Sequence, residues 1–237
     1  MPRVHFSFSI KKDAENWVDR IYSLKRGLAF ISPKELFSKY PPVVLNQLKK
    51  AGSRDKAYQW MHRYLQKDLR TRKKMSIIKQ ELKALEVVWR AREKSFFLVM
   101  EKILGKAIYR NDFTAYLTTF FRCPYSEKKH WLMVNFWASL PEQITGISHE
   151  LLHLQFLNQY RNFLESQGLN EEQIQHLKEA LTFLLNEKEF YNILIKPDKG
   201  YSTHADFRKE LKRLWDQKRR FDVFLPKAIA LTKNLFV

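Results

Sequence analysis

The chain has 237 residues, of which 45% are hydrophobic, so it can bury a core and is not an intrinsically disordered protein. Gly and Pro number only 6 and 8, which argues against collagen-like, linker-rich and all-β architectures and favours long helices. The formal net charge of +18 attracts nucleic acid, anionic lipid or an acidic protein partner, although a solvated basic surface explains it equally simply.

The single cysteine, Cys123, excludes an internal disulfide and a cysteine-based structural zinc site. No apolar run near the N-terminus is long enough for a signal peptide, and no stretch approaches the ~20 apolar residues of a transmembrane helix. These features predict a cytoplasmic protein without a membrane span.

The first 105 residues are predicted to be mostly helical. Residues 4–10 alternate between apolar and polar side chains, which is typical of a half-buried strand. Ser32, Pro33 and Glu35 form a helix-start signature. Helices are expected at 13–25, from Pro33 to just before Pro41, at 43–50 and at 55–104. The last of these is expected to be broken into two helices near 71–74.

The character of the chain changes after Gly105. The β-branched and aromatic segments 113–121 and 130–138 predict two strands, which together suggest a hairpin. Helices are expected at 141–166, 171–186, 203–217 and 225–235. The prediction is one α+β domain, 1–237, mostly helical. Its N-terminal region, 1–105, is mostly helical, and its C-terminal region is 106–237. A small mixed or antiparallel sheet, with strands near 4–10, 113–121 and 130–138, is expected to pack on helices 141–166 and 171–186.

The chemistry of the sequence is concentrated in His149-Glu150-Leu151-Leu152-His153. Histidines at i and i+4 lie one turn apart on the same face of a helix, where both imidazoles can bind one metal ion. Glu150 is rotated by about 100° from His149. It is therefore placed beside such a metal, where a general base can take a proton from a metal-bound water.

The helix around this motif is predicted to be buried, because Glu150 is the only formal charge between Ile144 and Tyr160. Buried histidines and glutamates need partners, and a zinc ion provides one. The alternative is that the two histidines and the glutamate satisfy one another by hydrogen bonds within the core.

These residues resemble the active-site helix of the zincin metallopeptidases. Gly146 and Gln155 depart mildly from the usual pattern of that family, and Phe156 and Gln159 occupy the positions where the met-zincins have Gly and His. The remaining resemblance is to the gluzincins, including the most compact of them, and it covers about 130–190.

The resemblance implies a third zinc ligand, a glutamate on the next helix. The candidates are Glu171, Glu172, Glu179, Glu187 and Glu189. We favour Glu179, because seven uncharged residues follow it and Thr182 and Asn186 share its helical face. The alternative for Glu179 is a surface pair with Lys178 or another basic residue.

The same resemblance implies a zinc-dependent peptidase that acts on a peptide or protein substrate, with Tyr201 or His204 as the donor to the developing oxyanion. The alternative, which we prefer slightly, is that Tyr201 is a turn residue and His204 a helix-start residue. Strand 130–138 is then the sheet edge that pairs with substrate. Asn135 and Trp137 share one face that can line the cleft, with a place in the core as the equal alternative for Trp137. No GxMxN-like aminopeptidase signature is evident, which favours an endopeptidase. Two other functions remain open: a basic nucleic-acid-binding protein that uses the helical segment 67–94, and a metal-binding scaffold without turnover.

Overall fold

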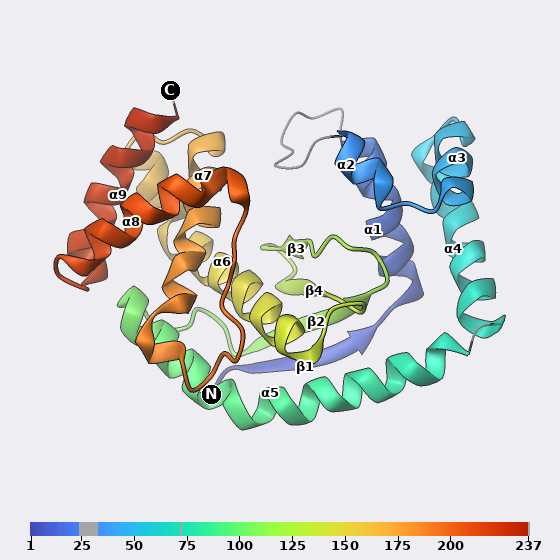
Figure 1. The fold of residues 1–237 in the computed structure, drawn as a ribbon, viewed down its shortest axis with the longest axis horizontal. Coiled ribbons are helices and arrows are strands. Elements are labelled where there is room, and N and C mark those ends of the chain that lie inside the picture. Colours follow the sequence, from blue (N-terminus) through green and yellow to red (C-terminus); the bar gives the residue numbers. More distant parts are fainter. Residues whose placement is uncertain (24–32, 72, 237) are drawn as a thin grey trace.

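The computed structural model describes residues 1–23, 33–71 and 73–236. It confirms the predicted fold class, since helices dominate and surround a small mixed sheet (Figure 1). Residues 24 and 25 of the first predicted helix, and the predicted capping residue Ser32, lie outside the described residues.

The N-terminal region has the predicted order of one strand followed by helices. The break expected near 71–74 is confirmed, and next to it Lys73 adopts a left-handed backbone conformation with φ of 51°. A left-handed residue cannot continue a right-handed helix, so the two long helices are separate. The elements are β1 (Arg3–Phe8), α1 (Ile10–Ser23), α2 (Pro33–Ser38), α3 (Pro42–Lys50), α4 (Arg54–Thr71) and α5 (Lys74–Leu104).

The sheet has four strands in the order β1-β2-β4-β3, where β2 is Asp112–Thr118, β3 is Tyr125–Ser126 and β4 is Trp131–Asn135. β2 pairs in parallel with both β1 and β4, and β3 pairs antiparallel with β4. The predicted hairpin is therefore wrong, because β2 and β4 run in the same direction. The strand within 130–138 is also not the sheet edge, since the two-residue β3 lies outside it.

Helices cover the sheet and extend beyond it. α1 contacts β2, α5 contacts β1, and α6 (Leu140–Ser166) contacts β4 and β3. The predicted capping box of α6 is present: the Ser139 side chain accepts from the backbone of Glu142, and the Glu142 side chain accepts from the backbone of Ser139. The chain then forms α7 (Glu171–Leu181), three 3-10 helices at Thr182–Asn186, Lys188–Phe190 and Ser202–His204, α8 (Ala205–Asp216) and α9 (Phe221–Leu235).

The predicted burial of the motif helix is confirmed. Along α6 the residues Ile147, Leu151, Leu154 and Leu157 are almost fully buried. Gln155, one of the departures from the zincin pattern, is buried as well; its side-chain amide donates to Ala107 and its oxygen accepts from the backbone of Tyr109. None of the described helices is long and apolar enough to cross a membrane.

Candidate metal centre

His149, Glu150 and His153 form a group that could hold a metal ion, with one ligand atom from each lying within 4.8 Å of the others. Both histidines come from the same face of α6, and their ring centroids are 4.3 Å apart. The Oε2 atom of Glu150 lies 3.4 Å from Nδ1 of His153. The helical spacing read from the sequence therefore brings the three side chains together.

Glu179 approaches the two imidazoles from α7. Its Oε2 atom lies 3.4 Å from Nε2 of His149 and 3.5 Å from Nε2 of His153. The other carboxylate oxygen, Oε1, accepts from Nζ of Lys178 at 2.8 Å. The pair of Glu179 with Lys178, considered from the sequence as a surface alternative, is thus present but buried, and it leaves Oε2 directed at the histidines.

Several polar atoms of this group have no hydrogen-bond partner among the described residues. They are Oε2 of Glu179 and both ring nitrogens of His153, all of them buried. Leaving such atoms unpaired is costly. The alternative in which the group satisfies itself by hydrogen bonds therefore fails at His153, and the arrangement suits a cation placed among these atoms.

His149 has a second partner that the sequence did not suggest. Its Nδ1 donates to Oδ2 of Asp198 at 2.7 Å. Asp198 is in turn held by Thr182 at 2.8 Å and by Arg208 at 3.0 Å. Such a carboxylate fixes the orientation of an imidazole and leaves its Nε2 available as a ligand.

Thr182 and Asn186, the two polar residues expected on the helical face of Glu179, also help to position His149. Asn186 donates to the backbone oxygen of Asp198 and accepts from its backbone nitrogen. Thr182 bonds the Asp198 carboxylate, as well as the backbone oxygen of Glu179. These residues therefore hold the Asp198 loop against His149, and their side chains form no hydrogen bond with the Glu179 carboxylate. The helix also ends earlier than predicted, with 182–186 forming a 3-10 turn.

The environment shifts the pKa values of the group in opposite directions. Burial opposes the charge of His149, but Asp198 and Glu179 outweigh it and raise the pKa of His149 to about 10. Burial, reinforced by Lys178, lowers the pKa of His153, which stays neutral and keeps its lone pair. Burial raises the pKa of Glu150 to about 7, against the opposing effect of His149.

The candidate metal centre lies in a cleft of about 720 Å³. Its lining includes Glu150, Tyr125 of β3, Tyr201 and Asn135, so Asn135 faces the cleft as expected. Trp137 is not among the described lining residues, and its ring nitrogen donates to the backbone of Thr119.

The structure separates the two predicted oxyanion donors. Tyr201 lines the cleft, and burial of its hydroxyl raises its pKa, after which Glu179 and Glu150 raise it further. His204 is buried, and its Nε2 lies 2.8 Å from Nδ1 of His176. His204 is not among the described residues that line the cleft, so only Tyr201 is brought near Glu150.

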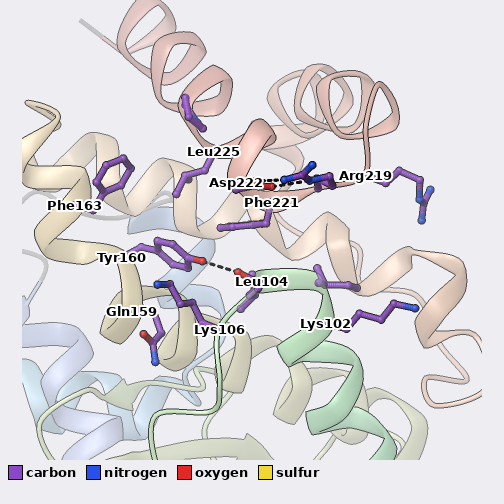
Figure 2. A pocket seen from close by; sticks show the side chains of 14 residues that line it. Lys102, Leu104, Lys106, Gln159, Tyr160, Phe163, Arg219, Phe221, Asp222 and Leu225 are labelled. Atoms are coloured by element: carbon purple, nitrogen blue, oxygen red, sulfur yellow. Dashed lines mark hydrogen bonds and ion pairs between the residues drawn. The ribbon is translucent and has the colours of Figure 1, made fainter.

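A second cavity, of about 740 Å³, lies where α5, α6 and α9 meet (Figure 2). Tyr160 donates there to the backbone oxygen of Leu104 at 2.5 Å, and Asp222 is bound by Arg220. Asp222 is the only carboxylate, and there is no histidine or cysteine, among the described residues that line it. The two cavities are similar in volume, so size does not distinguish them. The cleft is favoured as the functional site because it is lined by the clustered titratable groups His149, Glu150 and Glu179.

No protein-family model, curated protein or solved structure matches this chain.

Proposed function

We propose that this protein is a zinc-dependent peptidase of the gluzincin type, in which His149, His153 and Glu179 hold the metal and Glu150 is the general base. The observation that carries the proposal is the position of Glu179 Oε2, 3.4 and 3.5 Å from the two Nε2 atoms. Glu179 lies far beyond His153 in the sequence, on another helix, so the spacing of the motif alone does not produce this convergence.

The distances suit zinc better than hydrogen bonding. Two ligand atoms about 2.0–2.1 Å from one zinc ion in tetrahedral geometry are about 3.3–3.4 Å apart. Direct hydrogen bonds between these groups would bring the atoms to about 2.7–3.2 Å. The observed separations therefore fit ligands that share a metal, and the unpaired state of Glu179 Oε2 and His153 Nε2 supports the same assignment.

Two imidazoles and one carboxylate are a donor set typical of catalytic zinc, which acts as a Lewis acid and makes water acidic near neutral pH. Glu150 lies beside this donor set. Its carboxylate takes one proton from the attacking water as the water oxygen bonds to the carbonyl carbon. Glu150 then delivers that proton to the departing nitrogen as the C–N bond breaks, so one water is consumed for each peptide bond.

The remaining groups of the cleft have roles in binding substrate. β3 is the edge of the sheet, and Tyr125 of this strand lines the cleft, so an extended peptide can add to that edge through its backbone. Tyr201 is protonated at neutral pH, as tyrosine ordinarily is, and its hydroxyl is the donor that we assign to the developing oxyanion. We favour an endopeptidase, since no aminopeptidase signature accompanies the motif.

The test is to compare untagged wild-type protein with Glu150→Gln for zinc content and for cleavage of a peptide library read by mass spectrometry. The variant is expected to retain zinc and to lose cleavage by about 10²–10⁴-fold, the usual contribution of a general base. Glu165→Gln is the matched control, because Glu165 lies on the same helix but is exposed, 3.9 Å from Arg161.

Zinc without cleavage in the wild type would contradict the peptidase and indicate a scaffold. Absence of both, together with nucleic-acid binding that weakens steeply with salt, would identify the basic surface as the functional feature instead.

A further inference from the structure

The carboxylates that line the cleft are already matched by cations. Glu127 and Glu171 are both bound by Arg161, at 3.1 and 2.6 Å. Glu179 is bound by the buried Lys178 at 2.8 Å. These carboxylates therefore offer little uncompensated negative charge to a ligand, apart from the general base itself.

Three further cations line the cleft: Arg20 of α1, Lys39 just after α2 and Arg122 in the loop after β2. Arg122 and Lys39 form no ion pair with any residue that the structure describes. Arg20 lies in α1 and is only 9% exposed. In Figure 1, α1 and α2 stand to one side of β3, and α7 stands to the other.

Arg20 and Arg122 line the same cleft. Burial lowers the pKa of Arg20, and the positive charge of Arg122 lowers it further. The guanidinium group of Arg122 is planar and can bind a carboxylate through two parallel hydrogen bonds, so a carboxylate is the anion that Arg122 suits best.

The cationic group is also near the atoms that we assign to catalysis. Arg20, Lys39 and Arg122 line the same cleft as Glu150 and Tyr201. A substrate with its scissile bond beside Glu150 therefore presents a nearby side chain or chain end to these cations.

We propose that Arg122, together with Arg20 and Lys39, binds a carboxylate of the substrate, so that the cleft selects acidic peptides. This inference rests on the proposed peptidase function. The carboxylate comes either from an Asp or Glu side chain next to the scissile bond or from the C-terminus of a short peptide, and the experiment separates these two sources.

The experiment measures binding to full-length, zinc-loaded Glu150→Gln protein, so it does not depend on turnover. The probes are fluorescein-labelled decapeptides that differ only by Glu or Gln at one position, moved along the peptide, and each is made with a free and an amidated C-terminus. The same set is measured with Arg122→Gln added, and with Arg70→Gln as the control, which removes the same charge from an exposed position on α4.

For at least one position, or for the free C-terminus, the acidic peptide is expected to bind about tenfold more tightly than its neutral partner. Arg122→Gln reduces this ratio to below about threefold, whereas Arg70→Gln leaves it unchanged. Lys39→Gln provides a second variant at an exposed residue, and it lowers the ratio by a smaller amount.

Equal binding of acidic and neutral peptides at every position overturns the inference, as does a preference that Arg122→Gln and Arg70→Gln reduce alike. Either result leaves the proposed function standing if the wild type cleaves neutral peptides. Conversely, the wild-type protein could cleave no peptide and still show a preference for acidic peptides that depends on Arg122. That result supports the inference and contradicts the proposed peptidase function.

Discussion

Asp198 connects His149 to the protein interior, and its replacement by asparagine tests whether this contact prepares a metal ligand. The carboxylate is 7% exposed and has three charged or polar partners, His149, Thr182 and Arg208, at 2.7–3.0 Å. Loss of such a partner of a metal-binding histidine lowers metal affinity by about 10–100-fold, equivalent to about 1.4–2.7 kcal/mol.

The same substitution also lowers stability. Arg208, 8% exposed, loses its carboxylate partner but keeps the backbone oxygen of Asp198 as an acceptor. Breaking a buried ion pair costs about 3–5 kcal/mol, and the retained hydrogen bond places Asp198→Asn near the lower value of about 3 kcal/mol. Arg208→Met breaks the same pair without touching His149, so it is the control for the effect of stability alone.

The assay is competition for zinc against a chromophoric chelator at low temperature, together with urea unfolding of each variant. Asp198→Asn is expected to weaken both zinc binding and stability, whereas Arg208→Met weakens stability and leaves zinc affinity within about threefold. Unchanged zinc affinity in Asp198→Asn would refute the reasoning, because the contact with His149 would then be purely structural.

Two further predictions concern the framework of the site. Asp13 is fully buried and accepts from the backbone nitrogen and hydroxyl of Thr119 and from Thr118, so Asp13→Ala is expected to cost about 3 kcal/mol in urea unfolding; a loss below about 1 kcal/mol would contradict this. Lys196, helped by the capping box, lowers the pKa of Glu142 from 4.5 to about 2. A lowered carboxylate pKa stabilises the fold above the unfolded pKa, and this contribution is lost as the pH falls from 4.5 to about 2. The difference in Tm between wild type and Glu142→Gln should therefore be largest near pH 6 and should shrink towards pH 2; a constant difference would exclude this origin.

The helices could be predicted because their signals are local. Ser139, Pro141 and Glu142 mark the start of α6, and the expected span 141–166 differs from Leu140–Ser166 by one residue. The strand segments were recognised for the same reason, but their pairing was not. β1 and β2 pair in parallel across more than a hundred residues, and side-chain alternation within a strand carries no information about its partner.

The candidate site was also predicted only in part, because some of its features have local sequence signals and others depend on tertiary contacts. The i, i+4 spacing of His149 and His153 fixes their common face, and the absence of charge around Glu150 indicates burial. The contact of Asp198 with His149 joins residues 49 apart. A turn containing Lys196, Pro197 and Asp198 gives no local sign of it, because the loop is placed by tertiary contacts with Thr182 and Asn186. The buried state of Lys178 was missed for a similar reason, since its neighbours Tyr125 and Glu179 are brought together only by the fold.

The most direct test of the metal centre is the zinc content of untagged protein, measured by mass spectrometry for the wild type and for Glu179→Ala. Coordination by His149, His153 and Glu179 predicts one zinc ion per wild-type chain and loss of that zinc from the variant after dialysis against a weak chelator. A wild-type chain without zinc, or undiminished zinc in Glu179→Ala, would contradict this assignment.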